Sequence, residues 1–176
     1  MQKTIYDIVF LTGTPSFYKT NLFNCIANER KVLVVYCGYY DGAENSSEDE
    51  LNECKFDYNF LYKGDIDKRN KTKCFFKLIS ALRKIKYKNI IHEGWYIPEY
   101  IILSFLTPKR KNATMCESTI YESNISGLRG FIKRAIINRC STALPSGTAH
   151  KAIFDAMGFK GDIHITGGVG IFHKPE

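Results

Sequence analysis

The sequence lacks the features that mark several specialised classes of protein. Its 6 cysteines form no CxxC pair, and its 4 histidines show no metal-ligand spacing, so neither a disulfide framework nor a zinc site is indicated. The longest apolar run, residues 97–106 (IPEYIILSFL), is too short and too interrupted to span a bilayer. No signal peptide precedes the first predicted strand. We therefore expect a cytoplasmic protein with reduced thiols.

Complete nucleotide-binding and hydrolase motifs are also missing. No GxGxxG follows the first predicted strand, and no GxxxxGK[ST] occurs in the chain. Ser118 and Ser146 lie outside any GxSxG motif and have no convincing His/Asp arrangement, which argues against a serine hydrolase. The lysines are spread along the chain without an RRM, KH or helix-turn-helix pattern, so nucleic-acid binding is not favoured.

Positive charge is what the chain has in excess. The net charge is +7 and the isoelectric point is about 9.0. Such a balance favours anionic partners, such as phosphorylated small molecules or anionic lipid. The basic runs at 68–73, 83–88 and 109–111 border apolar segments, where solvated helix ends also carry charge. A hydrophobic content of 44% and an aromatic content of 14% indicate a packed globular domain.

Apolar patterns that suit strands and helices alternate along the chain. Continuous β-rich runs bounded by Gly or Pro predict buried parallel strands, and stripes of helical period predict helices. The predicted strands are residues 6–12, 31–36, 56–62, 89–92, 112–116, 140–145 and 162–166, and the run 56–62 is weaker and suits an edge strand. The predicted helices are residues 18–29, 71–86, 98–106, 126–138 and 147–157, the last with Ser146 as N-cap and Gly158 at C′.

This order predicts an α/β fold with a doubly wound, mostly parallel Rossmann-like sheet of about six to seven strands and helices on both faces. A chain of 176 residues suits one domain with a substantial core. In the predicted helix 126–138, Leu128, Phe131, Ile132, Ala135 and Ile136 share one face. Arg129, Lys133 and Arg134 lie towards the other face, so the helix is amphipathic.

Polar residues gather where the predicted strands end, which is where such a sheet binds its ligand. Glycines, hydroxyls and two carboxylates there suggest a crevice for hydroxylated or phosphorylated compounds. The candidates are Gly13, Thr14, Pro15, Glu93, Trp95, Glu117, Ser118, Ser146, Gly147 and Gly168. No metal ligand is among the predictions.

Several candidates also have a purely structural interpretation. Gly13 can simply permit a tight turn, and Trp95 can be a core aromatic rather than a platform for a sugar ring. Glu117 can cap a helix or form a salt bridge. His92 ends an apolar strand, a position where a satisfied core histidine is more common than a catalytic base.

The stretch 137–172 (INRCSTALPSGTAHKAIFDAMGFKGDIHITGGVGIF) resembles the N-terminal Rossmann-like domain of GT-B glycosyltransferases, in the large retaining group called family four. That family has a strand, a helix that starts with small residues and ends in (M/L)G, a second strand and a glycine-containing exit. HEGWYIPEY (92–100) and MCES (115–118) lie where the family has its acceptor-side loops. The resemblance covers essentially the whole chain.

The resemblance implies roles for the candidate residues. Glu117 is expected to be catalytic, at a position where many members carry a histidine and a subset carries Glu-Ser. The implied acceptor-binding residues are Gly13, Thr14, Pro15, Glu93, Trp95 and Ser118, and the cleft and donor-facing residues are Ser146, Gly147 and Gly168. Residues 1–166 would be the N-terminal domain, and 167–176 would begin the interdomain linker.

The resemblance also implies a second domain, in which a Glu-x7-Glu motif holds the nucleotide-sugar, and this sequence contains no such domain. We expect the chain to bind a glycan or lipid-linked acceptor in cell-surface polysaccharide synthesis, to bind no cofactor and to be inactive alone. Peripheral contact with an anionic membrane is expected from the basic edges. The alternative is a stand-alone binding module for a polyanion, a membrane surface or a protein partner.

Overall fold

The computed structural model describes residues 3–40 and 51–167, which form alternating strands and helices. The described strands are β1 (Ile5–Thr12), β2 (Val32–Tyr36), β3 (Asp57–Phe60), β4 (Lys86–Glu93), β5 (Asn112–Cys116), β6 (Thr142–Pro145) and β7 (Asp162–Ile163). The described α-helices are α1 (Phe17–Ala27), α3 (Lys71–Arg83), α4 (Pro98–Leu106), α5 (Gly127–Ile137) and α6 (Thr148–Ala156). Two short 3-10 turns, η1 (Ile66–Lys68) and η2 (Lys109–Lys111), complete the set.

The strands form one open parallel sheet in the order β3-β2-β1-β4-β5-β6-β7. The chain runs outward from β1 to β3, returns to β4 and then runs outward to β7. This reversal of direction defines a doubly wound sheet, in which right-handed crossovers place helices on both faces. The predicted fold class is therefore confirmed.

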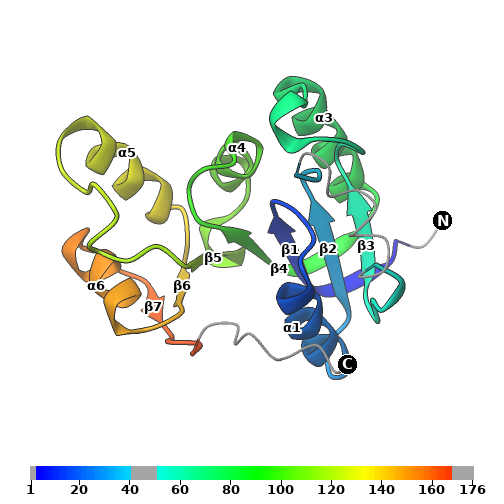
Figure 1. The fold of residues 1–176 in the computed structure, drawn as a ribbon, viewed down its shortest axis with the longest axis horizontal. Coiled ribbons are helices and arrows are strands. Elements are labelled where there is room, and N and C mark those ends of the chain that lie inside the picture. The colour runs from blue at the N-terminus through cyan, green and yellow to red at the C-terminus, as the bar shows by residue number, and fades with distance from the viewer. Residues whose placement is uncertain (1–2, 41–50, 168–176) are drawn as a thin grey trace. The chain divides into compact units, whose positions relative to one another are not determined.

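The chain divides within β4 into two compact units. The first contains the described residues up to Lys88, and Figure 1 shows its strands β1, β2 and β3 side by side. Its core includes Val9 and Val34, which are fully buried. The ring of Phe23 on α1 lies 4.6 Å from that of Phe10 and 5.7 Å from that of Phe56, which ties the helix to the sheet.

The second unit, residues 89–167, contains β5, β6 and β7, the last part of β4, and helices α4, α5 and α6. Its apolar core consists of Cys116, Ile137, Ala143, Ile153, Phe154 and Met157. A buried polar group supports this core: the Asn112 amide donates to the carbonyls of Ser104 and Arg139, at 3.0 and 2.9 Å. It therefore joins the start of β5 to the neighbouring helix ends.

The boundary between α3 and β4 differs from the predictions for a clear physical reason. α3 ends at Arg83 rather than at residue 86, and β4 begins at Lys86 rather than at residue 89. The amide of Lys86 donates to Thr4 O at 2.8 Å, and Lys88 forms a 2.6 Å ion pair with Asp7. These contacts extend the basic run as strand, although its composition suggested a helix end.

The terminal elements also shift slightly. Gly147 rather than Ser146 is the N-cap of α6, because Ser146 N donates to Cys116 O at 3.3 Å and so continues the strand. Gly158 has φ 68° just after the helix, so its predicted C′ role is confirmed. β7 ends at Ile163 rather than at residue 166, although Thr166 N still donates to Pro145 O at 3.0 Å.

The six cysteines are all free. Cys37, Cys74, Cys116 and Cys140 are buried, as expected for reduced core thiols, whereas Cys25 is exposed on α1 despite its apolar neighbours in the sequence. Within residues 3–40 and 51–167, none of the helices has the length and hydrophobicity of a membrane span.

Candidate functional site

The ends of three adjacent strands form a polar rim in the second unit. Gly94 N donates to Met115 O at 2.8 Å, which links the end of β4 to β5. Ser146 N donates to Cys116 O, which links the end of β6 to β5. Because β4, β5 and β6 are parallel, their carboxyl ends meet at one edge. The structure thus brings together Glu93, Trp95, Glu117, Ser118, Ser146 and Gly147, which we call the strand-end rim.

Glu117 is the exposed carboxylate of this rim. It directly follows the buried Cys116, and among the described residues its carboxylate has no hydrogen-bond or ion-pair partner. Burial, together with the charge of Glu117, raises the pKa of the Cys116 thiol to about 11. The thiol is therefore protonated at neutral pH and donates a hydrogen bond to Ser118 O at 3.5 Å. Of the two neighbouring side chains, Cys116 is buried and Glu117 faces solvent. Glu93, by contrast, is buried.

Trp95 is half-buried and already has contacts around its ring. Its ring centroid is 6.5 Å from that of Phe154 in the core, and the ammonium of Lys133 lies 5.1 Å from the Trp95 centroid. Lys133 also donates to Asn124 O at 3.0 Å, and burial, followed by the charge of Arg129, lowers the pKa of Lys133. These contacts favour the core interpretation of Trp95, and stacking on a sugar ring stays a prediction.

His92 is a satisfied core histidine, as its sequence position suggested. The side chain is buried, with Nδ1 3.1 Å from Gly94 O and Nε2 3.2 Å from Cys140 Sγ. Burial lowers the pKa of His92 to about 4, so the ring is neutral at physiological pH. It supports the Gly94 turn rather than supplying a base to the rim.

The N-terminus of α6 opens at the same edge. Gly147 is extended, with φ −167°, no side chain caps the first turn, and no acidic residue lies within that turn. A Cβ added to Gly147 would lie 3.3 Å from Nδ1 of His150. That nitrogen is buried and has no hydrogen-bond partner among the described residues. His150 is therefore a neighbour of the strand-end rim. It was not identified as a site residue from the sequence, because its position within a helix pattern does not distinguish it from a residue that packs in the core.

The loop after β1 belongs to the first unit. Gly13 O accepts from the amides of Cys37 at 2.8 Å and Gly38 at 3.1 Å, so this loop is joined to the residues after β2. Gly13, Thr14 and Pro15 are all buried within this loop. Gly13 does not have positive φ, so it does not serve as a left-handed turn residue. Gly168, the last predicted cleft residue, lies outside the described residues, as do the rest of 168–176.

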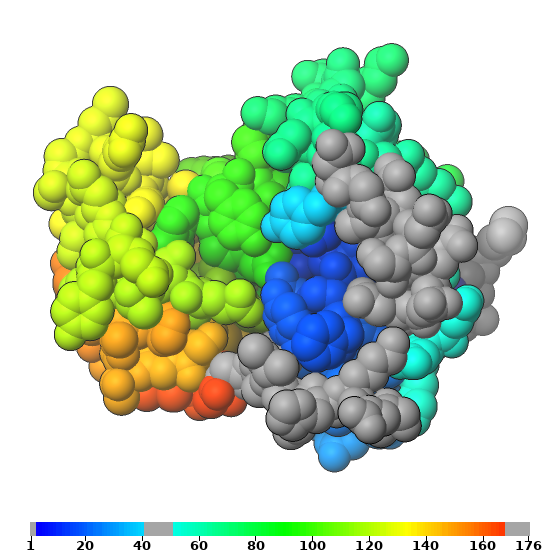
Figure 2. Space-filling view, in the orientation of Figure 1, coloured from blue at the N-terminus to red at the C-terminus, as the bar shows by residue number. Residues whose placement is uncertain are grey.

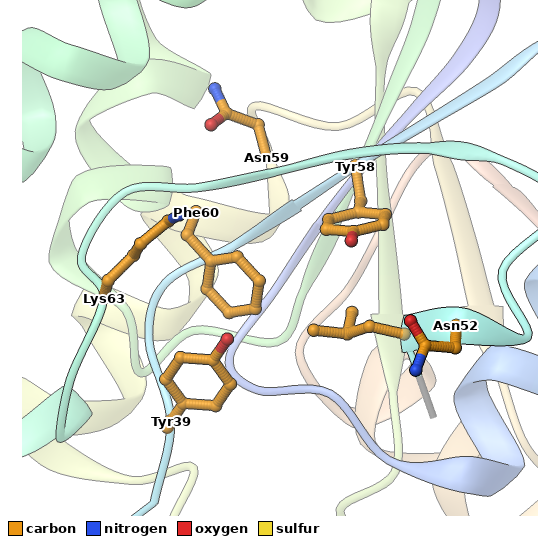
Figure 3. Close-up of a pocket in the computed structure, with 7 residues that line it drawn as sticks. Tyr39, Asn52, Tyr58, Asn59, Phe60 and Lys63 are labelled. Atoms are coloured by element: carbon orange, nitrogen blue, oxygen red, sulfur yellow. The ribbon is translucent and has the colours of Figure 1, made fainter. Parts of the chain in front are cut away.

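A pocket that the sequence did not predict lies beside β3 in the first unit (Figure 3). Its volume is about 380 Å³, and its lining residues are Tyr39, Leu51, Asn52, Tyr58, Asn59, Phe60 and Lys63. In Figure 3 the rings of Tyr39 and Phe60 lie together, with centroids 4.6 Å apart, and Tyr58 faces them across the space. Asn59 points away from these rings. The combination of aromatic rings, amides and one lysine suits a hydroxylated ligand.

This pocket had a signal in the sequence that the prediction of a plain edge strand did not use. Tyr58 and Phe60 are two residues apart and therefore share one face of β3. Tyr36 pairs with Phe60 in the sheet, with ring centroids 5.1 Å apart. An alternating aromatic pair beside a second aromatic cluster thus marks a ring-lined surface.

The described residues offer no group of three or more His, Cys, Asp or Glu side chains arranged to hold a metal ion. The chain matches no protein-family model and no curated protein sequence.

Proposed function

We propose that the chain is the acceptor-binding half of a retaining glycosyltransferase, which transfers a hexose from a nucleotide-sugar to a glycan or lipid-linked acceptor in cell-surface polysaccharide synthesis. A second, donor-binding domain would hold the nucleotide-sugar. This half would bind no cofactor of its own and would not turn over alone.

The strand-end rim is the observation that carries this proposal. It collects an exposed carboxylate, a hydroxyl group and an uncapped helix start at one edge of a parallel sheet. Ligands of open α/β sheets bind at this edge. Sugars present many hydroxyl groups, which carboxylates and backbone groups bind by hydrogen bonds.

Within the proposal, two rim residues, Glu117 and Gly147, have distinct roles. Glu117, exposed and without a partner in the described chain, accepts a hydrogen bond from the acceptor hydroxyl and orients it for attack. The free amides at Gly147 face the leaving diphosphate, since a helix N-terminus favours an anion. Stabilising that developing charge is usually a large part of catalysis, and a donor-binding domain would supply the remainder.

The pocket beside β3 extends the proposal to the first unit. A volume of about 380 Å³ accommodates a sugar ring with its solvent. Tyr58 is exposed and offers a ring face for contact, and Lys63 offers a cation. We assign this pocket to a sugar ring of the acceptor. The Gly13 loop, joined to the same unit, is assigned to the acceptor side as well.

The proposal places the protein in the cytoplasm, on the inner face of the membrane, where lipid-linked acceptors are used. Six cysteines without a disulfide agree with a reducing compartment. This location is part of the proposal, as are the roles given to Glu117 and to the pocket.

A binding experiment on the full chain tests the function directly. Trp95 is the only tryptophan, so its fluorescence reports on the strand-end rim. We expect one or more members of a panel of neutral and charged glycans to change this emission and to give saturation-transfer signals. Glu117→Gln removes a charged acceptor, so it should weaken binding about tenfold or more.

Glu122→Gln is the matched control. Glu122 is an exposed carboxylate in the following loop, where it accepts from Thr119 N at 3.2 Å. Its replacement should leave glycan affinity unchanged. A panel in which no glycan binds, or in which the two variants weaken binding equally, would remove the proposal.

The second candidate is a stand-alone binding module without catalysis. The basic composition, with a net charge of +7, favours it for polyanionic partners. Binding that depends on salt and anion charge but not on Glu117 would support the module over the transferase. Release of nucleotide from a nucleotide-sugar, when a donor-binding domain is added, would support the transferase.

A further inference from the structure

The apolar face of α5 is turned to solvent. Leu128 is 74% exposed, Phe131 67% and Ile132 49%. Their spacing of three and four residues places them on one side of the helix, and we call them the α5 stripe. In Figure 2 the yellow segment of α5 stands at the surface, with no other part of the second unit in front of it. An amphipathic helix normally buries this face, so its exposure needs an explanation.

The opposite side of α5 attaches the helix to its unit. Ile137 is buried on that side and belongs to the apolar core, whereas Ile136, four residues after Ile132, is buried at the C-terminal end of the stripe side. Gly130 is also buried, and a Cβ there would meet the backbone carbonyl of Ile125. Since the helix is held through these residues, the α5 stripe contributes little to holding the fold together.

The charges of α5 are all of one sign. The segment Gly127–Ile137 contains Arg129, Lys133 and Arg134 and no acidic residue. Lys133 is turned inward to Asn124 O and the Trp95 ring. In a helical projection of about 100° per residue, Arg129 and Arg134 fall on the two sides of the α5 stripe. A solvent-facing apolar stripe between two cations is typical of a helix that lies in a membrane interface.

We propose that the α5 stripe is a membrane-contact surface that inserts into the interface of an anionic bilayer, with Arg129 and Arg134 at the level of the lipid phosphates. The choice of occupant follows from charge complementarity: anionic lipid neutralises the flanking arginines. A second copy docked through the same stripe would instead bring like charges together across a two-fold axis. The surface is independent of sugar transfer, so the inference does not require the proposed function.

Vesicle flotation of the full chain tests this inference. Vesicles containing phosphatidylglycerol and phosphatidylcholine are compared with pure phosphatidylcholine, over a salt series. We expect binding to the anionic vesicles only. Leu128→Ser/Phe131→Ser/Ile132→Ser should reduce partitioning about tenfold or more, because it removes the inserted apolar surface. Arg129→Gln/Arg134→Gln should reduce it about tenfold, and should remove most of the salt dependence.

Phe76→Ser is the matched control, because Phe76 is 64% exposed on α3 and its loss removes an equally accessible aromatic side chain. It should bind anionic vesicles as the unmodified chain does. Circular dichroism and urea unfolding should show that all variants fold, since none replaces a buried residue. The inference is overturned if the chain does not bind anionic vesicles, or if the triple-serine variant binds as well as Phe76→Ser. It is equally overturned if light scattering shows a dimer that the triple-serine variant dissociates, since the occupant is then a second copy.

Discussion

The imidazole of His92 and the thiol of Cys140 meet inside the second unit, with Nε2 3.2 Å from Sγ. The other ring nitrogen, Nδ1, is 3.1 Å from Gly94 O, which can only accept a hydrogen bond. Nδ1 therefore carries the proton, and Nε2 accepts from the thiol. Burial raises the pKa of Cys140 to about 12, so the thiol keeps the hydrogen that this arrangement needs. The pair joins the end of β4 to the residues before β6 in a neutral form.

The neutral ring makes stability depend on pH. Burial lowers the pKa of His92 from 6.5 to about 4, so between these pH values the unfolded chain binds a proton that the folded chain does not. The contribution of His92 is present above pH 6.5 and is lost as the pH falls towards 4. We expect this loss to lower the free energy of unfolding by up to about 3 kcal/mol between pH 6.5 and 4, as measured by urea unfolding over a pH series.

His92→Asn isolates this effect from the carboxylates, which titrate in the same range. The variant lacks the titrating ring, so the difference in stability between it and the unmodified chain should shrink as the pH falls from 6.5 to 4. Parallel stability curves for the two proteins would show that His92 is accessible to protons in the folded chain, contrary to its burial.

Strands and helices with strong local patterns were predictable from the sequence. The predicted helix 98–106 and strand 112–116 coincide with α4 and β5, because Pro98 fixes the helix start and the polar pair Glu117-Ser118 ends the strand. The boundary at residues 84–88 was missed because a contact distant in sequence, the Lys88–Asp7 ion pair, favours the strand there. Local composition carries no information about such a partner.

The candidate site shows the same division. The placement of Glu117 and Ser146 at one sheet edge was predictable because parallel strands end at a common edge, and their roles stay predictions. The outward face of α5 was not found, since periodicity reveals which residues share a face but not which face is buried. Gly130, a residue without a side chain, lies on the buried side because the Ile125 carbonyl approaches it closely. The apolar stripe therefore faces the other way.

Replacing Asn112 should lower the free energy of unfolding more than replacing an exposed asparagine does. Its Nδ2 donates to Ser104 O and Arg139 O, and its Oδ1 accepts from Thr107 Oγ1 at 2.7 Å. In Asn112→Ala the Arg139 carbonyl loses this donor, the Ser104 carbonyl keeps only Arg139 Nε at 3.3 Å, and the cavity is not refilled. We expect a loss of about 3 kcal/mol in the free energy of unfolding, measured with urea at neutral pH.

Asn138→Ala provides the comparison for this variant, because Asn138 is exposed at the C-cap of α5. Its loss should be within about 0.5 kcal/mol, as is usual for a surface position. Equal destabilisation by the two variants would mean that the Asn112 network contributes nothing beyond an ordinary surface contact.

Gly130→Ala should destabilise the protein, although alanine is normally the better helix residue by about 1 kcal/mol. The added methyl would meet the Ile125 carbonyl, which belongs to the backbone and cannot rotate away. The start of α5 must then shift outward, carrying Lys133 away from the Trp95 ring. We expect a net loss of about 1–3 kcal/mol in the free energy of unfolding, measured with urea, and a change in Trp95 emission.

Gly158→Ala is the comparison, at a residue with φ 68° and open space around it. It should lower the free energy of unfolding by about 1 kcal/mol through backbone strain and leave the emission unchanged. If Gly130→Ala is instead as stable as the unmodified chain, helix propensity outweighs the contact, and the close approach of α5 to the 120–126 loop is not what orients its apolar stripe.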